Sequence, residues 1–227
     1  MSQTVEMHII ARIHSDFPTK FGIPRQSGLA DVPARIVFEP EYRNADALRG
    51  IEGFSHLWLI WQFSAAVRDG WSPTVRPPKL GGNKRIGVFA TRSPFRPNEI
   101  GPIPSVRLDR VEPNTPDGPV LHISGADLMD GTPIFDIKPY LAYTDSHPEA
   151  LGGFALTTDA VRVECPAQLL DKLPEERRQT LLNVLAQDPR PGYQHEPGRV
   201  YGFPFAGFEV KFTVEGDLLT VLQIESR

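Results

Sequence analysis

Three segments of this chain place charged side chains in loops that contain proline or glycine. The first is the tripeptide 24–26, which offers one arginine beside a proline. The second, residues 90–101, carries two arginines and an asparagine around two prolines, and the third, residues 125–140, combines three aspartates with turn-forming residues. Because a stiff loop holds polar groups at a fixed geometry, each segment could bind a charged ligand. The alternative is that arginine–aspartate pairs simply tie the loops together.

The positive charge of the chain is concentrated around the second of these loops. Residues 68–107 hold eight basic residues and two acidic ones, whereas the complete chain of 227 residues has a net charge of −4. Such an asymmetry indicates a local anion-binding face, although the overall negative charge does not by itself indicate a nucleic-acid-binding protein. Charge alone leaves a solvated loop as the alternative.

Other kinds of chemistry lack their usual residue patterns. The six histidines are scattered without the spacing of metal ligands, and Cys165 is the only cysteine, so we expect no metal site and no internal disulfide. The chain has no Gly-x-Gly-x-x-Gly turn, no Walker phosphate loop and no nucleophile elbow around Ser55. The N-terminus resembles no secretion signal, and no apolar run approaches the ~18 residues that cross a bilayer. We therefore expect a cytoplasmic protein.

The first 150 residues read as short strands separated by frequent turns. This pattern is typical of an antiparallel barrel or sandwich. Residues 54–63 form a long apolar run without alternation, so we expect both faces of this strand to be buried. One helical turn is expected at 44–48, ending before Gly50. The other strands are expected at 5–14, 34–38, 86–90, 105–111, 120–124 and 134–137.

The pattern changes after about residue 150. Residues 166–173 and 175–186 read as helices, and a loop follows at 187–199. Residues 205–214 and 218–225 form a predicted hairpin around Glu215-Gly216-Asp217. The sequence therefore predicts two domains: a mainly β domain at 1–150 and a small α+β domain at 151–227.

Several long motifs resemble the TsaA-like (YaeB) family. The resemblance covers most of the chain, and residues 76–83 and 87–93 match the family almost letter for letter. The other matching motifs are residues 24–26, 46–58, 130–133, 136–141 and 185–193. The resemblance implies an antiparallel β-barrel of TsaA-like type with a small C-terminal α+β domain.

The resemblance also implies an activity. Family members bind S-adenosylmethionine and methylate N6 of threonylcarbamoyladenosine next to the anticodon of a threonine transfer RNA, as homodimers with the ligand near the subunit interface. By position, the cofactor contacts carry over to Pro24, Arg25, Gln26, Ser64, Ala65, Arg92, Asp127, Leu128, Met129 and Asp130. The chain departs from the family where Ser64-Ala65 replaces a common His-Gln and where Glu99 replaces a proline. These departures keep open a non-enzymatic alternative, an S-adenosylmethionine-binding sensor or regulatory module.

Methyl transfer from a sulfonium is an in-line displacement, so the site must chiefly align two reactants and exclude water. The N6 nitrogen is a poor nucleophile, so an acceptor for its N–H would help, and a tyrosine could stack on the base. We expect Asp136 to be that acceptor and Tyr140 the stacking residue, with Asn98 as the alternative acceptor. Asp136 could instead tie down Lys138 or Arg92.

The C-terminal part offers candidates for RNA recognition. RNA loops are typically gripped by arginines and aromatic side chains. We therefore expect Asp188, Arg190 and Tyr193 to help place the anticodon loop of the transfer RNA. The alternative is that Asp188 and Arg190 pair with each other and close the loop after the second helix.

Overall fold

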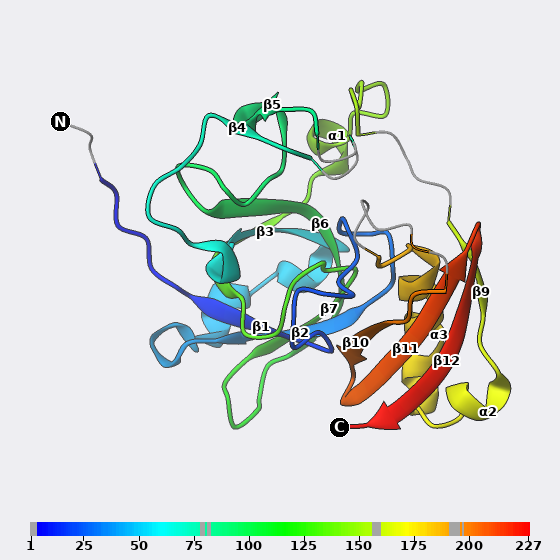
Figure 1. The fold of residues 1–227 in the computed structure, drawn as a ribbon. Helices are drawn as coiled ribbons and strands as arrows, with labels where there is room; N and C mark the ends of the chain where they lie inside the picture. The colour runs from blue at the N-terminus through cyan, green and yellow to red at the C-terminus, as the bar shows by residue number, and fades with distance from the viewer. Residues whose placement is uncertain (1–3, 78–79, 81–82, 156–159, 191–195, 197) are drawn as a thin grey trace.

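The computed structural model describes residues 4–77, 80, 83–155, 160–190, 196 and 198–227. Six strands close into a barrel in the order β1-β2-β7-β6-β3-β8, and each strand is antiparallel to its neighbours (Figure 1). Their bounds are β1 Ala11–Ser15, β2 Pro33–Phe38, β3 His56–Gln62, β6 Ile100–Glu112, β7 Val120–Ser124 and β8 Pro133–Pro139. The predicted antiparallel barrel is confirmed.

Alternating apolar residues fill the barrel. Ile13, Ile36, Leu57, Leu59 and Ile123 are fully buried, while their neighbours along each strand face outward. A six-stranded barrel has an interior that side chains can fill completely, so these aliphatic residues form a packed core. This core is the first of two that the described residues form.

The expectation that both faces of β3 are buried is wrong. Only Leu57 and Leu59 on the inner face are fully buried, and the residues between and beyond them are partly exposed. The outer face is covered in part by α1 (Ala142–Asp145), where Asp145 accepts a 2.7 Å hydrogen bond from the indole of Trp58. The bulky apolar residues on the outer face concealed the alternation that a barrel strand requires.

Three of the strands predicted within residues 1–150 differ from the observed ones by three or more residues at one end. β1 begins at Ala11 rather than at residue 5, and residues 88–90 form a short 3-10 turn, η6 (Val88–Ala90), after β5 (Ile86–Gly87). β6 begins at Ile100 and runs through two prolines. Over residues 100–106 β6 pairs only with β3, so a proline without an N–H is tolerated on the unpaired side.

Short turns and a two-stranded ribbon complete the first part of the chain. The helical turn predicted before Gly50 is confirmed as η2 (Ala45–Leu48), which Asn44 caps. Three more 3-10 turns are η1 (Pro40–Tyr42), η3 (Ile51–Gly53) and η4 (Ser64–Ala66). β4 (Thr74–Val75) pairs with β5 outside the barrel, at the top of Figure 1.

The C-terminal part forms a four-stranded sheet in the order β10-β11-β12-β9 with helices α2 and α3. The predicted helix at 175–186 and the predicted hairpin are confirmed as α3 (Glu175–Ala186) and as β11 (Phe208–Glu215) with β12 (Leu218–Ser226). α2 is shorter than predicted. The remaining bounds are α2 Ala167–Leu170, β9 Arg162–Glu164 and β10 Tyr201–Phe205. None of the helices in the described part of the chain is long and apolar enough to span a membrane.

The segment between β1 and β2 packs against the C-terminal sheet. Phe17, Ala30 and Val32 belong to the second hydrophobic core, together with buried residues of α3, β10, β11 and β12. Gly22 has a φ of +91°, and a Cβ atom there would lie 2.1 Å from the ring of Phe203. Only glycine fits both this backbone conformation and this close approach. The C-terminal sheet therefore fixes the position of the loop that carries residues 24–26.

Candidate functional site

A cavity of about 650 Å³ lies where several loops meet the adjoining ends of β3 and β6. Its volume falls within the range of small-molecule sites, which is roughly 300–1,000 Å³. The cavity is lined by residues from five stretches: 20–27, 61–68, 91–96, 100–103 and 127–132. All the predicted cofactor contacts except Asp130 line it, namely Pro24, Arg25, Gln26, Ser64, Ala65, Arg92, Asp127, Leu128 and Met129.

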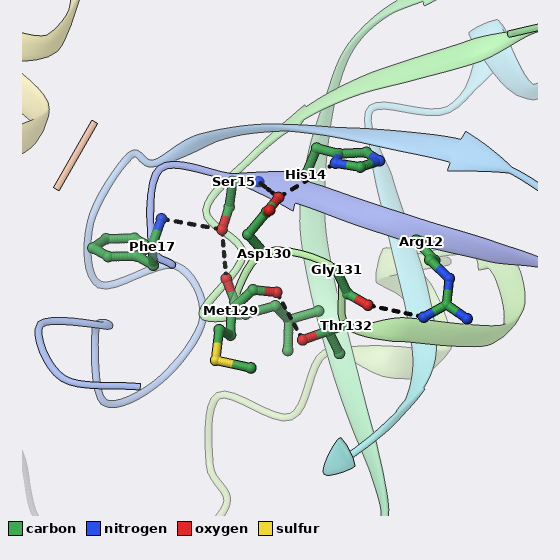
Figure 2. A network of polar contacts seen from close by, with 9 residues as sticks. Arg12, His14, Ser15, Phe17, Met129, Asp130, Gly131 and Thr132 are labelled. Carbon is green, nitrogen blue, oxygen red and sulfur yellow. Dashed lines mark hydrogen bonds and ion pairs between the residues drawn. The ribbon is translucent and has the colours of Figure 1, made fainter. Parts of the chain in front are cut away.

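Asp130 points away from the cavity and fastens its loop to β1. Its carboxylate accepts a 3.1 Å hydrogen bond from the backbone N–H of Ser15 and lies 3.3 Å from His14 (Figure 2). The hydroxyl of Ser15 donates a 2.9 Å hydrogen bond to the carbonyl of Leu128. In Figure 2 the side chain of Met129 extends on the other side of the loop from Asp130. The prediction that Asp130 faces the cofactor is therefore not supported by its position, and its contacts indicate that it holds the loop.

Arg25 is held by the C-terminal part of the chain. One terminal nitrogen of its guanidinium donates 3.0 Å hydrogen bonds to the backbone carbonyls of both Asp188 and Arg190. The neighbouring Gln26 accepts a hydrogen bond from Arg92 across the cavity. A chain of contacts thus joins the loop after α3 to two of the cofactor loops.

Asp127 brings an unsatisfied carboxylate to the lining. One of its oxygens is buried and has no hydrogen-bond partner in the described residues. Burial raises the pKa of Asp127 to about 6, although a backbone hydrogen bond and the charge of Arg92 oppose the rise. At neutral pH this carboxylate is therefore ionised, and a buried unpaired acceptor of this kind is costly unless a donor meets it.

Aromatic residues form another part of the lining. Trp61 packs against Phe63 with ring centroids 4.2 Å apart, and its indole N–H is buried without a partner in the described residues. Gly101 allows this packing, because a Cβ atom there would lie 2.7 Å from the indole ring. At the rim the guanidinium of Arg68 lies 3.7 Å from the ring centre of Phe95.

These lining residues fit S-adenosylmethionine. The aromatic surfaces of Trp61 and Phe63 suit an adenine ring, and Arg92 suits a carboxylate. The unpaired oxygen of Asp127 suits an amino or hydroxyl donor, and the unpaired N–H of Trp61 suits an acceptor. The sequence prediction missed Trp61, Phe63 and Phe95. The one signal in the sequence was that Trp61 and Phe63 end an apolar strand directly before the predicted contacts Ser64 and Ala65.

The predicted catalytic side chains lie outside the cavity. Asp136 pairs with Lys138 at 2.6 Å, which is the alternative that the sequence left open. Tyr140 packs edge-on against His56, at the far end of β3 from the cavity. Asn98 is exposed and does not contribute to the lining. The structure therefore does not bring the side chains of Asp136, Tyr140 or Asn98 into the lining of this cavity.

The predicted RNA contacts Asp188 and Arg190 bind each other. The guanidinium of Arg190 donates hydrogen bonds of 2.8 and 2.9 Å to the two carboxylate oxygens of Asp188, and its side chain is only 9% exposed. This is the loop-closing pair that the sequence left open as the alternative. Tyr193 lies outside the described residues.

The two departures from the family pattern have different positions. Ser64 and Ala65 line the cavity at the start of η4. Glu99 uses its backbone carbonyl to accept a 2.8 Å hydrogen bond from the N–H of Phe63, and its side chain does not belong to the lining. Within the residues that the structure describes, no cluster of three or more histidine, cysteine or acidic side chains could hold a metal ion.

Comparison with known proteins yields consistent matches over both parts of the chain. Residues 12–146 match the family described as the tRNA-methyltransferase O N-terminal domain, and residues 158–227 match the TrmO C-terminal domain. The tRNA (adenine(37)-N6)-methyltransferase of Escherichia coli K12 is 42% identical over 96% of this chain and 97% of its own length. A putative S-adenosylmethionine-dependent methyltransferase of Pseudomonas aeruginosa, RcsF, is 41% identical over 95% of each chain. A crystal structure of TrmO from Pseudomonas aeruginosa superposes with a TM-score of 0.80 at 34% identity and covers 100% of this chain and 99% of its own.

Proposed function

The chain belongs to the tRNA-methyltransferase O (TrmO) family, and from this premise we propose that it methylates N6 of adenine 37 in the anticodon loop of transfer RNA. It is an S-adenosylmethionine-dependent tRNA methyltransferase. The observation that carries this conclusion is the cavity in which the cofactor loops of the family come together. Within the described residues, the acceptor at Asp127 and the donor at Trp61 have no hydrogen-bond partner, so both suit a polar cofactor.

The chain contributes alignment and exclusion of water to the reaction. S-adenosylmethionine, when bound here, would supply an electrophilic methyl group for in-line transfer to the N6 nitrogen, with S-adenosylhomocysteine as the leaving group. Arg92 and Gln26, joined by a hydrogen bond, and the packed pair of Trp61 and Phe63 supply two parts of the cavity lining. We propose that Asp127 accepts a hydrogen bond from an amino or hydroxyl group of the cofactor.

We do not assign the removal of the N6 proton to Asp136, Tyr140 or Asn98 of the same subunit, because these side chains lie outside the cavity. Among the described residues, Asp127 is the only carboxylate in the lining. Loss of the proton to water after methyl transfer is compatible with this arrangement, since the methylated nitrogen becomes acidic as its positive charge develops.

We propose that the substrate adenosine carries a threonylcarbamoyl group, that the transfer RNA is that for threonine, and that the protein is a cytoplasmic homodimer. We also propose that residues 1–150 bind the cofactor and residues 151–227 help to recognise the transfer RNA. The close packing of residues 17–32 on the C-terminal sheet supports a shared role of the two parts.

Two measurements test the proposed function. Purified protein with S-adenosylmethionine carrying an isotopically labelled methyl group should label adenine 37 of transfer RNA, and nucleoside mass spectrometry of cells lacking the protein should show loss of the methylated nucleoside. Parallel reactions with and without the threonylcarbamoyl group decide which form is the substrate. Cofactor binding without any transfer to RNA would instead support a sensor or regulatory module. Light scattering gives the oligomeric state.

A further inference from the structure

Two large exposed aromatic side chains stack on each other, each on a segment that leads to the cavity lining. Trp71 is 51% exposed and Phe89 is 73% exposed, and their ring centroids lie 6.1 Å apart with an angle of 30° between the planes. Single exposed apolar residues are common, but a stacked exposed pair forms a contiguous apolar surface that soluble proteins usually keep for a partner.

The local structure holds this aromatic pair in place. Val88, next to Phe89, is almost fully buried, and its N–H donates a 2.9 Å hydrogen bond to the carbonyl of Pro73. The guanidinium of Arg85 donates a 2.9 Å hydrogen bond to the hydroxyl of Thr74 and so reinforces the β4–β5 ribbon. The pair therefore adjoins the braced β4–β5 ribbon, which is at the top of Figure 1.

The surface of Trp71 and Phe89 is continuous along the chain with the rim of the cavity. Arg68 lines the cavity three residues before Trp71, and Thr91 lines it two residues after Phe89. The aromatic pair is therefore two to three residues along the chain from the cavity lining, within reach of the groups that adjoin a base bound in the cavity.

The arginines of residues 68–96 differ from those elsewhere in the described chain, because carboxylates do not neutralise them. Most arginines elsewhere in the described chain form ion pairs with carboxylates, as Arg12 does with Glu39 and Arg43 with Asp117. In contrast, no carboxylate among the described residues forms an ion pair with the five arginines of this region: Arg68, Arg76, Arg85, Arg92 and Arg96. Unpaired arginines beside exposed aromatic rings favour a single-stranded nucleic acid, which offers both phosphates and unstacked bases.

We propose that Trp71 and Phe89 form a stacking platform for an unpaired base of the RNA loop that carries the target adenine. This inference rests on the proposed function. Adenine 37 must leave its stack to enter the cavity, so a neighbouring base loses a stacking partner, and the platform replaces that partner. The exposed Arg68 and Arg76 of the same region bind phosphates beside that base.

The test uses a fluorescently labelled hairpin RNA with the sequence of the anticodon arm, and Trp71→Ala, Phe89→Ala and Trp71→Phe variants of the full chain. We expect each alanine variant to weaken RNA binding, measured by anisotropy, and to raise KM for RNA by roughly 5- to 150-fold. Trp71→Phe should restore most of the affinity, because phenylalanine can still stack. Calorimetry should show unchanged affinity for S-adenosylmethionine, and melting curves should show that the variants are folded.

Phe54→Ala is the matched control. Phe54 is an exposed aromatic residue just before β3, at the end of that strand away from the cavity, so its loss should leave RNA affinity unchanged. Wild-type affinity for the hairpin in both alanine variants would overturn the platform, as would failure of the wild-type protein to bind the hairpin. Conversion of a dimer into a monomer by these substitutions would overturn it too, because the face would then join two copies of this chain. A wild-type protein that binds the hairpin through Trp71 but methylates nothing would contradict the proposed function and still support the platform.

Discussion

The guanidinium of Arg25 donates a 3.0 Å hydrogen bond to the backbone carbonyl of Asp188, 163 residues further along the chain. Arg25 belongs to the first cofactor loop, and Asp188 forms a bidentate ion pair with the nearly buried Arg190. The Asp188–Arg190 pair therefore helps to position the two backbone carbonyl groups that bind Arg25, a residue of the cavity lining. A change in this pair should reach the cofactor through Arg25.

Arg190→Ala should destabilise the protein and weaken cofactor binding. Removal of one partner from a largely buried pair costs on the order of 3 kcal/mol, which corresponds to a fall in melting temperature of roughly 6–12 °C for a chain of this size. Calorimetric titration with S-adenosylmethionine and thermal denaturation measure the two effects. The control is Arg162→Ala. Arg162 lies on β9 of the C-terminal sheet and forms a largely exposed ion pair with Asp217, so its loss should change little. Unchanged stability and cofactor affinity with a selective loss of RNA binding would restore Arg190 as a direct RNA contact.

Cofactor binding should weaken below pH 6 because of Asp127. Burial raises the pKa of this carboxyl to about 6, so the ionised acceptor is lost as the pH falls through that value. If Asp127 accepts a hydrogen bond from the cofactor, affinity should fall by up to about tenfold for each further pH unit, and Asp127→Asn should remove this dependence. Titrations between pH 5 and 8 with both proteins measure it. Parallel pH profiles for wild type and variant would show that Asp127 does not contact the cofactor.

The stability of the cofactor-free protein should respond to Asp127 with the opposite sign. A carboxyl whose folded pKa lies above its unfolded value binds more protons in the folded state between about pH 4 and pH 6. Its contribution to the free energy of unfolding therefore decreases as the pH rises through this window. Urea denaturation of wild type and Asp127→Asn across the window isolates that contribution as the difference between the two profiles. An increase in the free energy of unfolding of the wild type relative to that of Asp127→Asn as the pH rises would contradict the assignment.

Periodicity predicted the elements that bury a regular apolar pattern. β7 was predicted with its observed bounds at 120–124, and so was α3 at 175–186, because each carries its own clear pattern. β10 was missed because Phe205, Ala206 and Phe208 read as one continuous apolar run. The structure breaks that run at Ala206 and Gly207, which both have positive φ angles, and only tertiary packing on Asp16 reveals the turn.

For the candidate site, the sequence predicted which loops come together but not which side chains of those loops face the cavity. The resemblance placed three loops together, and the structure brings those loops to one cavity. Adjacent residues of one loop nevertheless point in opposite directions, so Asp127 faces the cavity while Asp130 holds β1. Trp61 read as ordinary core because it ends an apolar strand, and its indole N–H, unpaired within the described residues, is visible only in three dimensions.

Gly22→Ala should loosen the first cofactor loop from the C-terminal sheet. The new Cβ atom would meet the ring of Phe203 at 2.1 Å and would also require a left-handed backbone conformation. We expect a loss of stability of about 2–4 kcal/mol and a lower affinity for S-adenosylmethionine. Gly28→Ala is the matched control: Gly28 also has a positive φ, but a Cβ atom there would meet nothing within 4 Å, so only about 1 kcal/mol should be lost. Equal effects of the two substitutions would show that the contact with Phe203 is unimportant.

Binding of transfer RNA should weaken with salt, and Arg76 should contribute to that dependence. Arg76 is exposed and lies in the strongly basic stretch between β4 and β5, where it forms no ion pair with a carboxylate of the described chain. Loss of one phosphate contact reduces the slope of log affinity against log salt by about 1, so Arg76→Ala should show that reduction without any change in cofactor affinity. Arg49→Ala is the control, since Arg49 is equally exposed but already paired with Asp46. Filter binding of full-length transfer RNA at several salt concentrations measures both slopes. Identical slopes for wild type and Arg76→Ala would place the RNA backbone elsewhere on the surface.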